Sequence, residues 1–222
     1  MSLQSSVNEK VSPVTRSETI KECWAALLEQ ATREVFSMML GYELESEPGG
    51  PSSALNRDLI DPIPGRQPLI EVLFRRDAES SPNGNAEVTA VVGLAGELCG
   101  VLNFACGTAA ARMMAARLLG VDEADAGDQQ WDAIGEMCNM VAGNFKSKLP
   151  GGDRCMLSVP TIVVGSNYRL RTVSGRHKVE YRFRVATAPI RITLEVEMLG
   201  HHPGAEHNEP LPLPHAVEHL RE

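Results

Sequence analysis

Residues 179–198, VEYRFRVATAPIRITLEVEM, decide the fold class that this 222-residue sequence predicts. On both sides of a short turn, apolar and polar residues alternate with a period of two, which is typical of antiparallel strands that bury one face. The residues predicted to face the core are Val179, Tyr181, Phe183, Val185, Ile190, Ile192, Leu194, Val196 and Met198. Charged residues and threonine alternate with them, so we expect the opposite face to be polar.

Upstream of this hairpin, the sequence predicts further strands and three helices. Two largely apolar segments, 86–94 and 98–106, are separated by a tight Ala-Gly-Glu connection and predict a second hairpin. Shorter strands are predicted at 69–76 and 156–164, and helices at 17–40, 109–119 and 130–149. The order helix, strands, helix, helix, strands predicts an α+β fold in which helices pack on an antiparallel sheet.

One domain is predicted, at residues 17–200, with a flexible polar tail at 1–16 and a flexible His- and Pro-rich tail at 201–222. Within the domain, residues 45–68 contain five prolines and three glycines. Because proline fixes φ and removes a backbone donor, we expect a long irregular loop there.

The first predicted helix begins at Ser17 or Thr19 and ends before Gly41. Its apolar residues recur at helical spacing and predict one buried face: Ile20, Trp24, Leu27, Ala31, Val35 and Met38. Its charged residues carry both signs, which favours packing in a globular core over a helix on a membrane surface.

Composition and charge narrow the classes of function. With 21 Lys and Arg residues against 29 Asp and Glu, the net charge is −8, which argues against binding to nucleic-acid backbones. No apolar run reaches the ~18 residues of a membrane span, and the first residues lack the apolar core of a secretory signal. The five cysteines form no C-x-x-C pair, so we expect buried, reduced thiols in a cytoplasmic protein.

The third predicted helix, QWDAIGEMCNMVAGNFKSKL at 130–149, separates an apolar face from a polar one. At about 100° per residue, the predicted core residues are Trp131, Ile134, Cys138, Val141, Phe145 and Leu149. The opposite face, expected to meet solvent, holds Asp132, Glu136, Asn139, Gly143 and Lys146. Glu136 and Asn139 are three residues apart, so their Cβ atoms lie ~5–6 Å from each other on one surface.

Two glycines, Gly135 and Gly143, lie beside this polar pair in the helix interior, where each costs ~1 kcal/mol relative to alanine. They predict bare helix surface that a partner can approach closely. The tetrapeptide E-x-x-N alone carries little information, because a chain of this composition contains about one such match by chance. A solvated helix face is the structural alternative.

The flanks of the helix make the pattern more specific. WDAIGEMCNMVAGNFKSKL, followed by the strand MLSVPTIVVG, resembles the signature helix and following strand of the CheC/CheX/FliY phosphatases of bacterial chemotaxis. The preceding VTAVVGLAGELCGVLNFACGTAAARMMAARLLG and the first helix with EVFSMMLGYEL are similar to the same family, so the resemblance covers about residues 19–199 apart from 45–68. CheC-type members usually carry a second E-x-x-N in the first helix. Its absence here makes the chain most like CheX.

This resemblance implies a phosphatase-type regulator of two-component signalling that hydrolyses the aspartyl phosphate of a CheY-like receiver domain. It implies that Asn139 positions the attacking water and that Glu136 anchors the complex through a lysine of the receiver. Asp132, Gly143 and Lys146 are expected at the interface. No cofactor is expected on this chain, whereas Mg²⁺ is expected on the partner receiver. A homodimer formed through the terminal hairpin is left open, and no nucleic-acid or membrane partner is expected.

Two other classes of function are weighed against hydrolysis. A non-catalytic receiver-binding or flagellar-switch interaction module would use the same helix face, because that face and not a pocket carries the polar residues. A metal site at His201, His202 and His207 lacks a predicted element to fix ligand geometry. His177 is expected in a solvated turn, and Cys138 is expected to be a small core residue and not a nucleophile.

Overall fold

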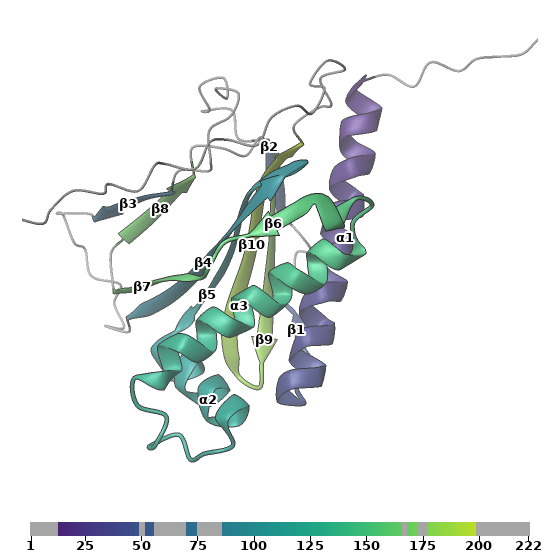
Figure 1. Cartoon of the computed structure of the whole chain (residues 1–222). Helices are drawn as coiled ribbons and strands as arrows, with labels where there is room; N and C mark the ends of the chain where they lie inside the picture. Colours follow the sequence, from purple (N-terminus) through teal and green to yellow (C-terminus); the bar gives the residue numbers. More distant parts are fainter. Residues whose placement is uncertain are drawn as a thin grey trace, which may run out of the picture.

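The structure is a computed structural model that describes residues 13–48, 52–55, 70–74, 86–165, 168–172 and 177–198. Within these residues, three helices cover one face of an eight-stranded antiparallel sheet (Figure 1). The strand order is β1-β9-β10-β5-β4-β6, with β2 also paired to β9 and β7 also paired to β4. The predicted α+β fold, with helices packed on an antiparallel sheet, is confirmed.

The bounds of the elements follow the chain order. The main sheet contains β1 (Glu45–Ser46), β2 (Ser52–Leu55), β4 (Glu87–Gly96), β5 (Leu98–Gly107), β6 (Cys155–Leu157), β7 (Thr161–Gly165), β9 (His177–Val185) and β10 (Ala188–Met198). The helices are α1 (Pro13–Leu40), α2 (Thr108–Leu119) and α3 (Gln129–Lys148), and the 3₁₀ turn η1 (Gly152–Arg154) follows α3. A separate two-stranded sheet pairs β3 (Ile70–Phe74) with β8 (Tyr168–Thr172).

The terminal hairpin, β9 and β10, has the predicted inward face. Eight of its nine predicted core residues are at most 5% exposed, and the side chain of the ninth, Met198, is not among those that the structure describes. Both strands lie inside the sheet, because β9 is also paired with β1 and β2 and β10 is also paired with β5. Within the described residues, both strands of the hairpin, which the sequence left open as a dimer contact, are therefore paired on their outer edges by strands of the same chain.

Helix α1 starts earlier than predicted, and its buried face is rotated. It begins at Pro13, so residues 13–16 are helical and not part of a tail, which agrees with the preference of proline for the first helical position. Met38 is 70% exposed, so its predicted burial is wrong. The buried stripe instead passes through Phe36 and Leu40, which lie four residues apart on one face.

The segment predicted as an irregular loop, 45–68, contains two strands. β1 and β2 both pair with β9, which would otherwise be an unpaired sheet edge. That prediction is therefore wrong for residues 45–46 and 52–55. Residues 56–68, the predicted C-terminal tail at 201–222 and residues 1–12 lie outside the described residues.

The strand predicted at 156–164 is divided into β6 and β7, which both pair with β4. The interruption is at Ser158–Pro160, where proline cannot donate to the ladder. The Ser158 amide donates to the Gly93 carbonyl (2.9 Å), and the Ser158 hydroxyl accepts from the Gly93 amide (2.9 Å). Ser158 therefore keeps this connection attached to the sheet beside α3.

Candidate functional site

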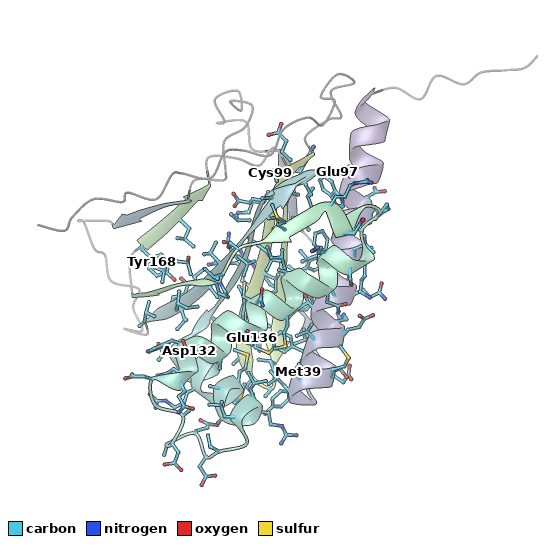
Figure 2. The ribbon with its side chains drawn as sticks, viewed as in Figure 1. Met39, Glu97, Cys99, Asp132, Glu136 and Tyr168 are labelled. Atoms are coloured by element: carbon cyan, nitrogen blue, oxygen red, sulfur yellow. The ribbon has the colours of Figure 1, made fainter. Side chains whose placement is uncertain are left out.

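Helix α3 lies across the sheet between the other two helices of the layer and presents one polar face (Figures 1 and 2). Its inward face is closed, because Ile134, Met137, Cys138, Val141 and Phe145 are all 0% exposed. The predicted core residues Trp131 and Leu149 are only partly buried at the two ends of the helix. The predicted phase of the helix is confirmed.

The polar face carries Glu136 and Asn139 as predicted. Glu136 and Asp132 are exposed and Asn139 is half-buried. Among the residues that the structure describes, the side chains of Glu136 and Asn139 have no hydrogen-bond or ion-pair partner. The carboxamide of Asn139 is not among the buried polar groups without a partner, so it reaches solvent. A carboxylate and a carboxamide are therefore available to another molecule on one helix face.

The two glycines beside this pair have different surroundings. A Cβ atom at Gly135 would lie 3.2 Å from Ile162 Cδ1 and 3.3 Å from Pro160 Cβ. Gly135 therefore makes room for the chain's own β6–β7 connection, and its predicted role in admitting a partner is wrong. A Cβ atom at Gly143 would meet nothing closer than Leu157 Cδ1 at 4.0 Å, and Gly143 itself is half-buried.

Asn139 is bordered by that same connection. Gly135 and Gly143 lie one turn before and one turn after Asn139, in the same row along the helix. Since the two glycines face Pro160 and Leu157 respectively, residues 157–160 run past Asn139 on one side. This neighbour explains why Asn139 is half-buried while Glu136, one residue row away, is exposed.

Helix α1 fixes the other end of α3. Glu34 accepts hydrogen bonds from Lys148 Nζ (2.9 Å) and Asn144 Nδ2 (2.9 Å), and the Asn144 amide also donates to the Ala31 carbonyl. Hydrogen bonds from Lys148, Asn144 and Gln30 lower the pKa of Glu34 to about 2. Lys146, which is expected at the interface, is half-buried and takes no part in this network.

The surface near Glu136 is strongly acidic, a feature that the E-x-x-N motif does not by itself predict. From residue 118 to residue 145 the chain contains no Lys, Arg or His. Six carboxylates in this stretch are exposed and, within the described part of the chain, have no ion-pair partner: Asp122, Glu123, Asp125, Asp128, Asp132 and Glu136. A basic partner surface would be attracted to this half of α3.

Other candidate groups are placed away from this face. Cys138 is fully buried and burial raises the pKa of its thiol, which confirms it as a core residue. Four of the five cysteines are buried, but Cys23 is exposed, contrary to the prediction. His177 is the first residue of β9 and its ring lies edge-on to Trp24 at 5.6 Å, so its assignment to a solvated turn is wrong.

Metal ligation has no support in the described residues, where no group of three or more His, Cys, Asp or Glu side chains is placed to hold an ion. His201, His202 and His207, which the sequence analysis considered as metal ligands and did not favour, lie outside those residues. None of the described helices has the length and apolar character needed to cross a bilayer.

The layer of three helices on an antiparallel sheet is the fold of solved CheX and CheC-like proteins. CheX from Vibrio vulnificus superposes with a TM-score of 0.56 at 17% identity, over 78% of this chain and 99% of that one. A CheC-like superfamily protein from Shewanella (TM-score 0.54, 18% identity, 78% and 97% covered) and CheX from Desulfovibrio desulfuricans (0.52, 20%, 78% and 99%) share this fold.

The family comparison agrees with the fold. Residues 88–184, from β4 to β9 and including all of α3, match the family model described as chemotaxis phosphatase CheX. The predicted resemblance to the CheC/CheX/FliY family, and its CheX-like character, are confirmed by this match and by the shared fold. No curated protein sequence matches the chain.

Proposed function

We propose that the protein binds a CheY-like receiver domain through α3 and hydrolyses the receiver's aspartyl phosphate. The observation that carries this proposal is the Glu136–Asn139 pair on the polar face of α3, which has no partner among the described residues and lies inside the segment that matches the CheX model. Neither side chain has a hydrogen-bond partner within the described residues, so neither has to break such a bond before it binds the receiver.

The proposed role of Asn139 is to hold the attacking water. Its carboxamide offers a donor and an acceptor and carries no charge that would repel the phosphoryl group. The water oxygen bonds to phosphorus while the bond to the aspartyl oxygen breaks, and the carboxylate leaves with the electron pair. Inorganic phosphate keeps the water's protons. Most of the catalytic effect then comes from positioning, since the phosphoryl group is already electrophilic.

Glu136 has a different proposed role, because a carboxylate beside the phosphoryl group would be repulsive unless it binds a cation. We assign Glu136 to an ion pair with a lysine of the receiver. Glu136 lies about one helical turn from Asn139, the residue proposed to meet the phosphoryl group. The acidic surface around it favours the approach of such a basic group. Asp132, Gly143 and Lys146 would border the contact, and the receiver would supply Mg²⁺.

A non-catalytic binding module remains the second candidate, because the pair lies on an exposed helix face. The two functions predict opposite results with a receiver phosphorylated by a small-molecule donor. A phosphatase accelerates phosphate release with turnover, whereas a binding module leaves it unchanged or slows it. Phosphate release measured over a range of receiver concentrations distinguishes them.

The variant Asn139→Ala tests the mechanism in the same assay. We expect the acceleration to fall at least about 100-fold, with KM within about twofold, because a water-positioning group acts only on the reacting complex. Glu136→Gln and Glu136→Lys should instead raise KM. Asn144→Ala is the matched control, since Asn144 is on the same helix but bonds to Glu34. An undiminished rate for Asn139→Ala would exclude the mechanism.

Dimerisation is a separate proposal. The sequence left a homodimer open, and within the described residues both strands of the terminal hairpin already have neighbours in the sheet. A dimer would have to use one of the outer strands, β1 and β2 on one side or β6 and β7 on the other, or a face of the molecule. Light scattering on the purified protein determines the oligomeric state.

A further inference from the structure

A group of exposed apolar side chains lies where α1 and α2 end. Met38 (70% exposed), Met39 (43%), Leu119 (42%) and Val121 (43%) form what we call the apolar corner. The two helix ends are joined, because Arg117 Nε of α2 donates to the Leu40 carbonyl of α1 (2.9 Å). Large apolar side chains gathered at one exposed place indicate a surface that is covered by another molecule.

The apolar corner belongs to the same layer of helices as the Glu136–Asn139 pair. On α1, Glu34 contacts Asn144 and Lys148 of α3, and Met38 follows Glu34 by one turn on the same side of the helix. Figure 2 labels Met39 at the end of α1 and Glu136 on the neighbouring α3. The half-buried Met140 lies on α3 one turn after Glu136, so apolar surface continues from α3 toward α1.

The size of a protein interface connects these two surfaces. A stable protein–protein contact covers about 800 Å² on each partner, whereas a helix is only about 10 Å across. A receiver that takes Asn139 into its active site therefore also covers what lies beside α3. Residues 157–160 border Asn139 on one side, and the helices α1 and α2 flank α3 within the layer.

We propose that Met38 and Met39, at the end of α1, form a second docking element that packs against apolar side chains of the receiver domain and sets affinity without entering the chemistry. This inference rests on the proposed function. Methionine suits the task, because its flexible, polarisable side chain adapts to a partner surface. The arrangement also has the composition of ordinary interfaces, in which apolar contacts accompany a few specific polar ones.

The test uses Met38→Gln, alone and with Met39→Gln, in the phosphate-release assay with phosphorylated receiver. Glutamine keeps the length and the helix propensity of methionine. We expect KM to rise about tenfold in the double variant, as for loss of an apolar interface anchor, with kcat within about twofold. Met156→Gln is the matched control, because Met156 is also 70% exposed but lies in β6, opposite Ala95 on the sheet face away from the helices.

The outcomes separate this inference from the proposed function. If Asn139→Ala abolishes hydrolysis and the Met38 variants keep a normal KM, the inference is overturned and the phosphatase stands. If wild-type protein releases no phosphate but binds the receiver, the affinity of the Met38 variants still decides the inference. Equal effects of Met38→Gln and Met156→Gln would overturn it. Loss of a dimer in light scattering without a change in KM would instead assign the corner to a second copy of this chain.

Discussion

The helices α1 and α3 contain stretches of similar sequence whose polar side chains have different surroundings. WAALLEQAT in α1 and WDAIGEMCN in α3 each place a glutamate five residues after a tryptophan and a polar residue three further on. The pairs are Glu29 with Thr32 and Glu136 with Asn139. The two residues of each pair have the same spacing in sequence. The surroundings of the side chains must therefore decide which pair is a candidate site.

In α1 both polar groups are used by the fold. Thr32 is 0% exposed and its hydroxyl donates to the Leu28 carbonyl (2.7 Å). Glu29 accepts two hydrogen bonds from Arg33, at 2.8 and 3.0 Å. In α3, by contrast, Glu136 and Asn139 have no partner within the described part of the chain. A glutamate followed three residues later by a polar residue therefore becomes a candidate site only where the helix leaves both side chains exposed and without a partner in the fold.

The variant Thr32→Asn should give the largest effect, because it copies the α3 motif into α1. Asparagine has nearly the volume of threonine but carries more polar groups, and at a fully buried position they lack partners. We expect the free energy of unfolding to fall by about 2 kcal/mol. Urea unfolding followed by circular dichroism measures this loss.

Phosphate release by variants at positions 32 and 139 tests the same difference between α1 and α3. In the Asn139→Ala background, Thr32→Asn should restore no phosphate release, because position 32 cannot reach a receiver. Restored hydrolysis would mean that exposure does not distinguish the two helices, and the comparison would fail. Thr32→Ser is the matched control, since it keeps the hydroxyl that bonds to Leu28.

The two glycines of α3 offer a smaller test within one helix. Gly143→Ala should stabilise the protein by about 0.5–1 kcal/mol, because alanine is the better helix former and nothing lies closer than 4.0 Å. Gly135→Ala should instead destabilise by about 1 kcal/mol, because its Cβ atom would push on Pro160 and Ile162 at 3.2–3.3 Å. Thermal and urea unfolding of both variants show whether each one raises or lowers the free energy of unfolding. Equal stabilisation would show that the β6–β7 connection yields freely.

The parts of the fold that were predicted correctly are those with a local periodic signal. Apolar and polar residues alternate with period two in β9 and β10, and apolar residues recur at helical spacing in α3. The sequence alone was therefore enough to predict which face of each element is buried. The same reasoning placed Glu136 and Asn139 on the outer face of α3. It was wrong for Met38, whose apolar side chain fits the helical pattern but lies beyond the covered face.

The features that were missed depend on contacts between distant residues. β1 and β2 form because β9 has an edge to pair, and the proline-rich segment that contains them has no strand signal of its own. The space left by the missing side chain of Gly135 is filled by Pro160, which lies 25 residues further along the sequence. Whether Glu136 has a partner likewise depends on the whole fold. Sequence could therefore place the pair but could not show that it is free.

The smallest predicted effect concerns the contact that sets α1 against α3. Hydrogen bonds from Lys148, Asn144 and Gln30 lower the pKa of Glu34 from 4.5 to about 2. A lowered pKa in the folded state stabilises the protein above the unfolded value, and this contribution is lost as the pH falls from about 4.5 toward 2. The difference in unfolding free energy between wild type and Glu34→Gln should thus be constant above pH 5.5 and shrink at pH 3.

Because Glu34 is solvent-accessible, added salt should reduce the difference. Glu123→Gln is the matched control, because it removes an exposed carboxylate on the loop before α3 and leaves the contact between α1 and α3 intact. A Glu34 difference that persists unchanged at pH 3 would mean that packing, and not the ionised carboxylate, joins the two helices.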